Sequence, residues 1–324
     1  MERARYPNKP IQTVASLARA LGQTPGFLES IAQRAPDLYI GPKKKLKRDG
    51  VTYRDVFDTK APLKELLRSI NKILFAQVEF PRYLQGSIKG RDFVSNVEVH
   101  ADAGVLISED IRKFFDHITA DHVHRIWHEF FCFGDAPSAL LTKLTTNERR
   151  VFQGTPTSSY LANLALWDVE PQVVRKLAER GIKYSRYVDD VTLSRKDGLS
   201  SADKTWALAQ IFAMFRSRGF TPAREKHSIQ TARAPNAKPL SVMGLTVGRG
   251  RVSLPSSERA SIRSMVHELE VLFDRSETGL EFRESLERAS GKVGRLKRHH
   301  PDQAEGLRER LNAMRKAIVD AGSS

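Results

Sequence analysis

The sequence predicts an α+β fold in which a central antiparallel sheet is backed by helices. Short runs rich in β-branched residues, such as "GVLISEDI" (104–111) and "VTLSR" (191–195), are typical of strands. Longer segments between them carry apolar residues at i, i+3 and i+4, which is the helical spacing. This order of helices and short strands, without a regular βαβ alternation, favours α+β.

The first 60 residues predict a helical pair and a hairpin. Residues 11–35 form two amphipathic helices interrupted at "GQTPG", and they are either packing helices or a helix-turn-helix DNA reader. Residues 43–58 form a hairpin around Asp49-Gly50, which is a strong turn signal. Its lysines are either a solvated edge or a basic flap over phosphates.

The remaining elements follow from the same patterns. We expect helices over 63–77, within 112–131, as one long helix over 155–181, and over 201–219. We expect strands at 104–111, 183–188 and 191–195, and short strands around 228–232, 241–247 and 251–255. Residues 256–320 are helical and rich in Arg and Lys.

Charge and cysteine content restrict the class of protein. The 53 Lys and Arg against 38 Asp and Glu give a formal charge of +15, which favours a polyanionic partner such as nucleic acid. The single cysteine, Cys132, excludes an internal disulfide and fits a reducing cytoplasm. No signal peptide and no apolar run of 18 residues is present, so we expect a soluble, cytoplasmic protein without a membrane partner.

Three aspartates carry the predicted chemistry. Asp189 and Asp190 lie between two short strands, at the tip of a predicted hairpin, and Asp110 ends another strand. Carboxylates this close do not both ionise unless a cation lies between them. Mg²⁺ prefers carboxylate and phosphate oxygens, so the three predict a two-metal site for phosphoryl transfer.

At this point the chain resembles the reverse transcriptases. Tyr187-Val188-Asp189-Asp190 resembles their Y-x-D-D signature, and four further stretches resemble their other motifs in family order over residues 40–255. These are "SEDIRKFFDHI", "QGTPTSSYLANLAL", "GFTPAREKHSI" and "VMGLTV". The resemblance implies a right-hand polymerase with an N-terminal helical extension (1–38), fingers (39–100), palm (101–255) and a basic helical thumb (256–324).

The resemblance also implies roles for individual residues. Asp110, Asp189 and Asp190, helped by the backbone carbonyl of Ile111, would bind two Mg²⁺ ions, with Mn²⁺ as an alternative. Phe115 would lie beneath the incoming sugar and select deoxynucleotides, while Phe114 belongs to the core. The other residues expected to bind the nucleotide are Lys47, Arg54, Gln153, Gly154 and Lys226. The first two would grip the triphosphate, and Lys226 would act as a general acid unless it is simply solvated.

The stretch "GSIKGRDFVSNVEVH" (86–100) narrows the resemblance to retron reverse transcriptases. Arg91, Asn96 and His100 match their G-R-S-x-x-x-N-A-x-x-H motif, and they either bind RNA or shape the fold. Asp92 and Val97 replace the usual Ser and Ala, and Val242-Met243-Gly244 replaces the family's V-T-G. In the C-terminal helices Arg295, Lys297 and Arg298 would hold RNA stem-loops, unless they only form a charged solvent face.

A retron enzyme would copy its own structured noncoding RNA, which supplies template and primer, into a branched RNA-linked single-stranded DNA. Its partners would be that RNA, the DNA product, deoxynucleotides and an effector toxin in an antiphage system. Two alternatives stay open from the sequence. One is another bacterial reverse transcriptase, of the abortive-infection or diversity-generating type; the other is a non-catalytic nucleic-acid-binding scaffold.

Overall fold

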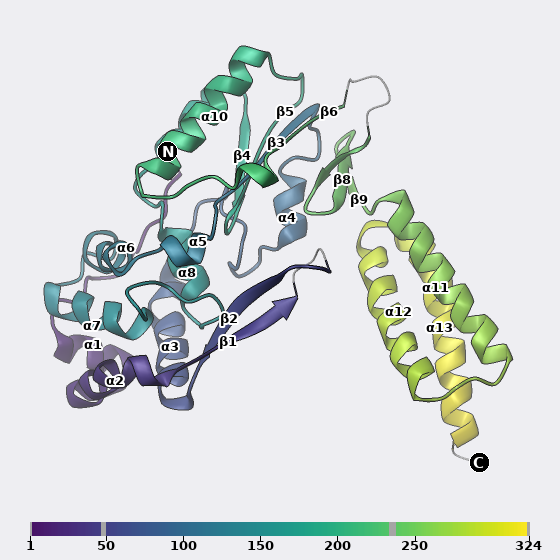
Figure 1. Cartoon of the computed structure of the whole chain (residues 1–324), viewed down its shortest axis with the longest axis horizontal. Helices are drawn as coiled ribbons and strands as arrows, with labels where there is room; N and C mark the ends of the chain where they lie inside the picture. The colour runs from purple at the N-terminus through teal and green to yellow at the C-terminus, as the bar shows by residue number, and fades with distance from the viewer. Residues whose placement is uncertain (1, 47–49, 233–237, 323–324) are drawn as a thin grey trace. The chain divides into compact units, whose positions relative to one another are not determined.

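The computed structural model describes residues 2–46, 50–232 and 238–322 (Figure 1). The chain divides into two compact units, each with its own core. The first comprises Met1–His100 and Gly104–Gln230, and the second Ala101–Ala103 and Thr231–Ser324. Among the described residues, no helix is both long and apolar enough to cross a lipid bilayer.

The first unit is a mixture of helices and strands, as predicted. Its helices contribute apolar side chains to one common core, except Phe93–Glu98 and Arg224–Lys226, which add none to it. They are α1 (Val14–Leu21), α2 (Pro25–Leu38), α3 (Ala61–Ile73), α4 (Phe93–Glu98), α5 (Phe114–His117), α6 (Ala120–Arg125), α7 (Asp135–Thr145), α8 (Ser158–Leu164), α9 (Glu170–Glu179) and α10 (Ser201–Arg216), with short helices η1 (Phe75–Gln77), η2 (Ile126–Phe130) and η3 (Arg224–Lys226).

The central sheet of this unit has four strands in the order β4-β5-β3-β6, which lie side by side in Figure 1. Their bounds are β3 (Val105–Asp110), β4 (Lys183–Tyr187), β5 (Asp190–Arg195) and β6 (Ser228–Thr231). Strand β5 pairs antiparallel with β4 on one side and with β3 on the other. The predicted antiparallel sheet is therefore confirmed, and β5 occupies an interior position in it.

A separate hairpin is formed by β1 (Tyr39–Leu46) and β2 (Tyr53–Thr59). Their antiparallel register runs from Tyr39 opposite Thr59 to Leu46 opposite Tyr53. The predicted hairpin is confirmed, although Asp49 in its turn lies outside the described residues. Its lysines 43–45 are exposed, and Lys44 forms an ion pair with Asp55 at 2.8 Å.

Helices α1 and α2 are packing helices. Thr13 caps α1 through its hydroxyl, and Gly22 ends the helix with a left-handed φ of 66°. Leu17 and Leu28 are completely buried, and their helices pack against each other and against α3 and α7. Because their apolar faces are buried in the core, the two helices match the interpretation of residues 11–35 as packing helices.

Two helical segments are more broken than the periodicity predicts. The apolar pattern of 112–131 is divided among α5, α6 and η2, since Lys113 adopts a left-handed φ of 46° before α5 and Thr119 caps α6. The predicted single helix over 155–181 is wrong, because α8 ends at Leu164 and α9 begins at Glu170. Pro171 lies in the first turn of α9, where its missing N–H costs nothing.

The second unit contains a small sheet and three long helices. The sheet is antiparallel in the order β7-β8-β9, with bounds Leu240–Val242, Leu245–Gly248 and Arg251–Ser253. The helices are α11 (Ser256–Asp274), α12 (Leu280–His299) and α13 (Pro301–Gly322), which pack on one another. Their contact is apolar, with Val266, Leu286 and Leu311 buried, which confirms the predicted helical C-terminal segment.

Candidate active site

The hairpin of β4 and β5 places two aspartates at its turn. Tyr187 pairs with Asp190, so Val188 and Asp189 alone form the turn and Asp190 begins β5. Val188 has a φ of 61°, which is a strained conformation for a β-branched residue. Such a conformation persists only where the surrounding structure holds it in place.

Strand β3 supplies the third carboxylate. Asp110 ends β3 and is the cross-strand partner of Asp190 in β5. The backbone N–H of the next residue, Ile111, donates to the carbonyl of Asp189 at 3.1 Å. The structure thus brings together the three aspartates that the sequence singled out, and Asp110 is only 5% exposed.

The surroundings of Asp189 and Asp190 oppose ionisation of their carboxyl groups. Burial, reinforced by the charge of Asp110, raises the pKa of Asp189 to about 6. Burial and the charges of Asp189 and Asp110 raise the pKa of Asp190 well above its ordinary value. The three groups therefore form a concentration of negative charge that a nearby cation would stabilise.

One such cation belongs to the chain itself. Lys226, at the end of η3, donates from Nζ to Oδ2 of Asp110 at 2.6 Å. Burial lowers the pKa of Lys226, but the bond to Asp110 and the nearby carboxylates outweigh it, so the pKa is raised. Lys226 is thus charged at neutral pH. It was predicted to contact a nucleotide, and in this structure its partner is Asp110.

The site was also predicted to bind metal ions, and its donor set fits them chemically. Within the part of the chain that the structure describes, no three His, Cys, Asp or Glu side chains are already arranged as a ligand cluster. Hard divalent cations nevertheless prefer carboxylate oxygens. The pKa values of Asp189 and Asp190 are raised, and a bound cation would stabilise their ionised forms. Asp110 accepts the bond from Lys226 through Oδ2, and its carboxylate keeps further lone pairs for a metal.

The three aspartates line a cavity of about 670 Å³, a size typical of small-molecule sites. The residues predicted to bind metal or nucleotide that line it are Asp110, Ile111, Asp189, Asp190, Arg54, Phe115, Gln153 and Lys226. Gly154 does not line it, and Lys47 lies outside the described residues. Most of the predicted site is therefore gathered around one cavity.

The two phenylalanines of α5 have different environments, as predicted. Phe114 is buried and packs edge-to-face on Phe220, with ring centroids 5.0 Å apart. Phe115 is only half-buried, and both residues line the cavity. The contact of Phe115 with the sugar of a nucleotide stays a prediction.

Gly154 lies against the β1–β2 hairpin, and its contact with a nucleotide stays a prediction. Its φ is +106°, and a Cβ on it would lie 2.6 Å from the carbonyl oxygen of Phe57 in β2. Next to it, the carbonyl of Gln153 accepts a hydrogen bond of 2.8 Å from the N–H of Phe57. The glycine therefore permits a close approach to the β1–β2 hairpin, and this contact holds Gln153 at the cavity.

The residues matching the retron motif of 86–100 shape the fold. His100 is completely buried, and its ring nitrogens bond to the hydroxyls of Ser194 and Ser185 at 2.7 and 2.8 Å. Asn96 is 1% exposed. Arg91 donates to backbone carbonyls, including that of Phe80 at 2.9 Å. Contrary to the predicted RNA contact, Asn96 and His100 are not accessible to a ligand in this structure.

The replacement of Ser by Asp in this motif has a local explanation. Asp92 is the N-cap of α4, and its Oδ1 accepts from the N–H groups of Val94 and Ser95 at 2.9 Å each. The hydroxyl of Ser95 in turn accepts from the N–H of Asp92, which completes a capping box. An Asp at this position therefore performs the capping that a Ser would.

The basic residues predicted to hold RNA stem-loops lie on α12 in the second unit. Arg295 donates to Oε1 of Glu258 in α11 at 2.6 Å and is about one-third exposed. Lys297 lies 3.9 Å from a carboxylate oxygen of Glu305 in α13. Both side chains thus help to join the three helices, while Lys297 keeps half of its side chain exposed.

A buried arginine that was not predicted from the sequence lies behind the turn between β4 and β5. Arg186, two residues before Val188, has no exposed surface. It donates to both carboxylate oxygens of Glu170, at 2.6 and 2.8 Å, and to the carbonyl of Val188 at 2.9 Å. Two further bonds reach the carbonyls of Ala162 and Asn163 in α8. All five guanidinium N–H groups are therefore used.

This network connects the strained turn to two helices. Glu170, at the start of α9, is 1% exposed and also accepts from the hydroxyl of Tyr184 at 2.6 Å. Gly86 lies against the other side of the turn, and a Cβ on it would be 2.6 Å from Cγ2 of Val188. The available sequence signal was the charged Arg186 at an inward-facing strand position beside the two aspartates.

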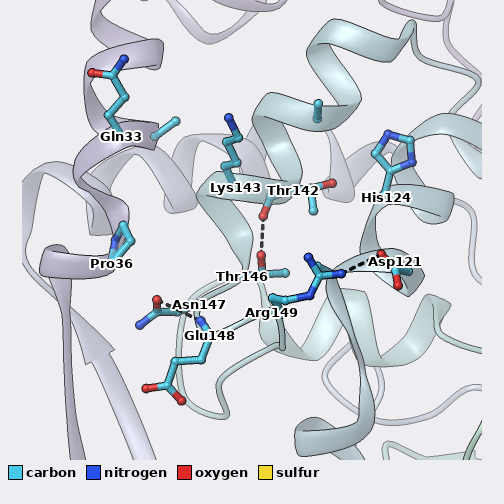
Figure 2. A pocket seen from close by; sticks show the side chains of 13 residues that line it. Gln33, Pro36, Asp121, His124, Thr142, Lys143, Thr146, Asn147, Glu148 and Arg149 are labelled. Carbon is cyan, nitrogen blue, oxygen red and sulfur yellow. Dashed lines mark hydrogen bonds and ion pairs between the residues drawn. The ribbon is translucent and has the colours of Figure 1, made fainter.

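A second cavity, of about 560 Å³, lies between α2, α6, α7 and the turn that follows α7. Figure 2 shows Asp121, His124, Lys143 and Arg149 around it, with an ion pair between Arg149 and Asp121. None of the residues predicted to bind metal, nucleotide or RNA lines this cavity.

Comparisons with known proteins agree with the geometry. A family model described as reverse transcriptase (RNA-dependent DNA polymerase) matches residues 46–247. The chain is 30% identical over 324 residues to the Retron Se72 reverse transcriptase of Salmonella heidelberg (strain 579083-10), covering 99% of this chain and 84% of that protein. It is 31% identical over 334 residues to the Retron Ec48 reverse transcriptase of Escherichia coli, covering 97% and 80%.

Among solved structures, a telomerase from Candida albicans in complex with a fragment of telomeric RNA is similar at a TM-score of 0.45 and 12% identity. The likeness covers 81% of this chain and 54% of that chain. At this TM-score it does not bear on the fold.

We predict that Asp189→Asn stabilises the metal-free protein at high pH. Since burial raises the pKa of Asp189 from 3.8 to about 6, ionisation costs stability that grows as the pH rises between these values and is complete above 6. The shift corresponds to about 3 kcal/mol. In EDTA, the melting temperature of the variant should exceed that of the wild type at pH 8 and differ little at pH 4.

The control for this measurement is Asp203→Asn. The hydroxyl of Ser200 lowers the pKa of Asp203, so this substitution gives no gain at high pH. Equal melting temperatures of wild type and Asp189→Asn at pH 8 would contradict the assignment of buried negative charge.

We predict that Arg186→Met destabilises the protein by about 3–5 kcal/mol, because Glu170 is left buried without its partner. The double variant Arg186→Met/Glu170→Met should recover part of this loss. Arg5→Met, which breaks an exposed ion pair with Glu79, should cost less than about 1 kcal/mol. Denaturant unfolding measures all three, and a cost below 1 kcal/mol for Arg186→Met would contradict the anchoring role.

Proposed function

The chain belongs to the retron reverse transcriptases and is an RNA-directed DNA polymerase, and we propose that it extends a primer hydroxyl with deoxynucleotides using two Mg²⁺ ions. Membership of this family implies the right-hand polymerase fold, with which the antiparallel sheet of the first unit agrees. The observation that carries the proposal is the meeting of Asp110, Asp189 and Asp190 at one cavity.

Asp110, Asp189 and Asp190 would hold the metal ions, with the carbonyl of Ile111 as an additional ligand. When bound, the ions activate the primer hydroxyl and neutralise the negative charge of the leaving pyrophosphate. The burial of the carboxylates supports this role, because electrostatic stabilisation is stronger in a site from which water is largely excluded.

The other cavity residues would orient the nucleotide. Arg54 extends from β2 into the cavity wall and would bind the triphosphate, together with Lys47. Phe115 would lie against the sugar and exclude a 2′-hydroxyl, while Gln153 would contact the nucleotide from the turn before α8. Lys226 carries a proton on Nζ at neutral pH. Once the bond between Lys226 and Asp110 opens, Lys226 would donate this proton to pyrophosphate.

The template is proposed to be the chain's own structured noncoding RNA. Priming would start at an internal guanosine 2′-hydroxyl and yield a branched RNA-linked DNA, and an effector protein would join the complex in antiphage defence. The net charge of +15 supports a polyanionic partner. Lys297 and Arg298, with Arg295 beside them on α12, are proposed to contact RNA phosphates; residues 256–324 would be the thumb.

We predict that Asp190→Asn lowers the rate of RNA-templated DNA synthesis by more than about 100-fold, because it removes a carboxylate that would hold the metal ions. Asp203→Asn, in the first turn of α10, should keep wild-type activity because Asp203 does not line the cavity. Primer extension with purified protein and Mg²⁺ measures both. Unchanged synthesis by Asp190→Asn in a protein of unchanged melting behaviour would reject the catalytic assignment.

The retron product is tested separately. Nucleic acid that copurifies with the wild type should contain DNA joined to RNA through a 2′–5′ bond, which a debranching enzyme releases. The same preparation from Asp190→Asn should contain the RNA without DNA. Linear DNA alone from the wild type would leave the polymerase intact and reject the branched product, in favour of another bacterial reverse transcriptase type.

A further inference from the structure

Two neighbouring arginines of one tight turn face different cavities. The turn spans residues 147–150, and it is closed by hydrogen bonds in both directions between the backbones of Asn147 and Arg150, at 3.0 and 2.9 Å. Glu148 and Arg149 both have left-handed φ values, of 46° and 58°. Arg149 lines the cavity of Figure 2, whereas Arg150 lines the catalytic cavity.

Arg150 is held by three contacts, of which Asp116 also lines this cavity. Its Nη1 donates to Oδ1 of Asp116 at 2.7 Å, and its Nη2 to Oε2 of Glu148 at 3.2 Å. Its guanidinium carbon lies 5.0 Å from the ring centroid of Phe152. These contacts fix a long side chain that is about one-third exposed.

Asp116 immediately follows Phe115 in α5, a helix of only four residues. The helix begins after the left-handed Lys113, so its own backbone bonds do little to fix its orientation. Contacts from the 147–150 turn therefore have a large influence on it. Besides the ion pair, the N–H of Val151 donates to the carbonyl of Ile118 at 2.9 Å, and that of Ala120 to the carbonyl of Arg149 at 2.8 Å.

We propose that Arg150 is a positioning residue for sugar selection: through its ion pair with Asp116 it holds Phe115 at the position where that ring excludes a ribose 2′-hydroxyl. This inference rests on the proposed role of Phe115. It goes beyond that role, because it assigns the selectivity to a pair of charged residues from two segments 34 residues apart.

Exclusion of a single hydroxyl depends on the exact position of the Phe115 ring. A displacement of about 1 Å in an active site is enough to change a rate by about 100-fold. A supporting shell is required to hold such a residue, and the backbone of a four-residue helix does not supply it alone. The Arg150–Asp116 pair is half-exposed and contributes little to global stability, so its main effect is local.

The test compares Arg150→Met, Asp116→Asn and the double variant. For each, kcat and KM are measured for one deoxynucleotide and the matching ribonucleotide, on the same template and primer. Each single variant should lower the selectivity, given as the ratio of the two kcat/KM values, by about tenfold or more. The double variant should lose no more than either single variant, since all three break the same ion pair.

Arg149→Met is the matched control. It removes a neighbouring arginine whose ion pair with Asp121, at 3.4 Å, lies on the other side of the turn. Its selectivity should equal that of the wild type. Loss of selectivity in Arg149→Met as well would overturn the proposal, because the effect would then come from the turn as a whole.

Two further outcomes would also overturn it. An equal rise of KM for both nucleotides in Arg150→Met, with unchanged selectivity, would mean that Arg150 contacts the triphosphate itself. Unchanged kinetics would mean that the pair has no role. Phe115→Ala separates this inference from the proposed function: if it loses selectivity and Arg150→Met does not, only the inference fails; if Phe115→Ala keeps selectivity, the proposed role of Phe115 fails.

Discussion

The pairing of Asp110 with Asp190 across two antiparallel strands is the contact on which the rest of the site depends. It brings Asp110 of β3 beside Asp190 of β5, and the turn between β4 and β5 places Asp189 next to them. Burial then raises the free energy of the ionised forms, so positive charge must be supplied. Lys226 supplies positive charge to Asp110 in this structure.

Holding these groups in place requires an anchor behind the turn. The buried pair of Arg186 and Glu170 costs desolvation energy, and an apolar pair would give comparable stability. What an apolar pair would not give is a hydrogen bond to the carbonyl of Val188, whose left-handed conformation needs support. The network therefore contributes to the geometry of the turn between β4 and β5 more than to the stability of the fold.

Features with a local cause were predicted from the sequence. Turn chemistry and the two-residue period gave the β1–β2 and β4–β5 hairpins, and the helical period separated buried Phe114 from Phe115. The break between α8 and α9 was missed because the apolar pattern continues through it, although Pro171 marks where a new helix starts. The burial of His100 was missed because its partners, Ser185 and Ser194, lie on strands about 90 residues later.

The sequence by itself singled out three aspartates, their order along the chain, and a basic charge that fits a nucleic acid partner. Only the tertiary structure decided how they are used. It paired Lys226 with Asp110, Arg186 with the turn, and Arg150 with Asp116. The physical reason is that local patterns encode dihedral preference and burial, whereas contacts between distant segments depend on strand register and packing, which no short stretch specifies.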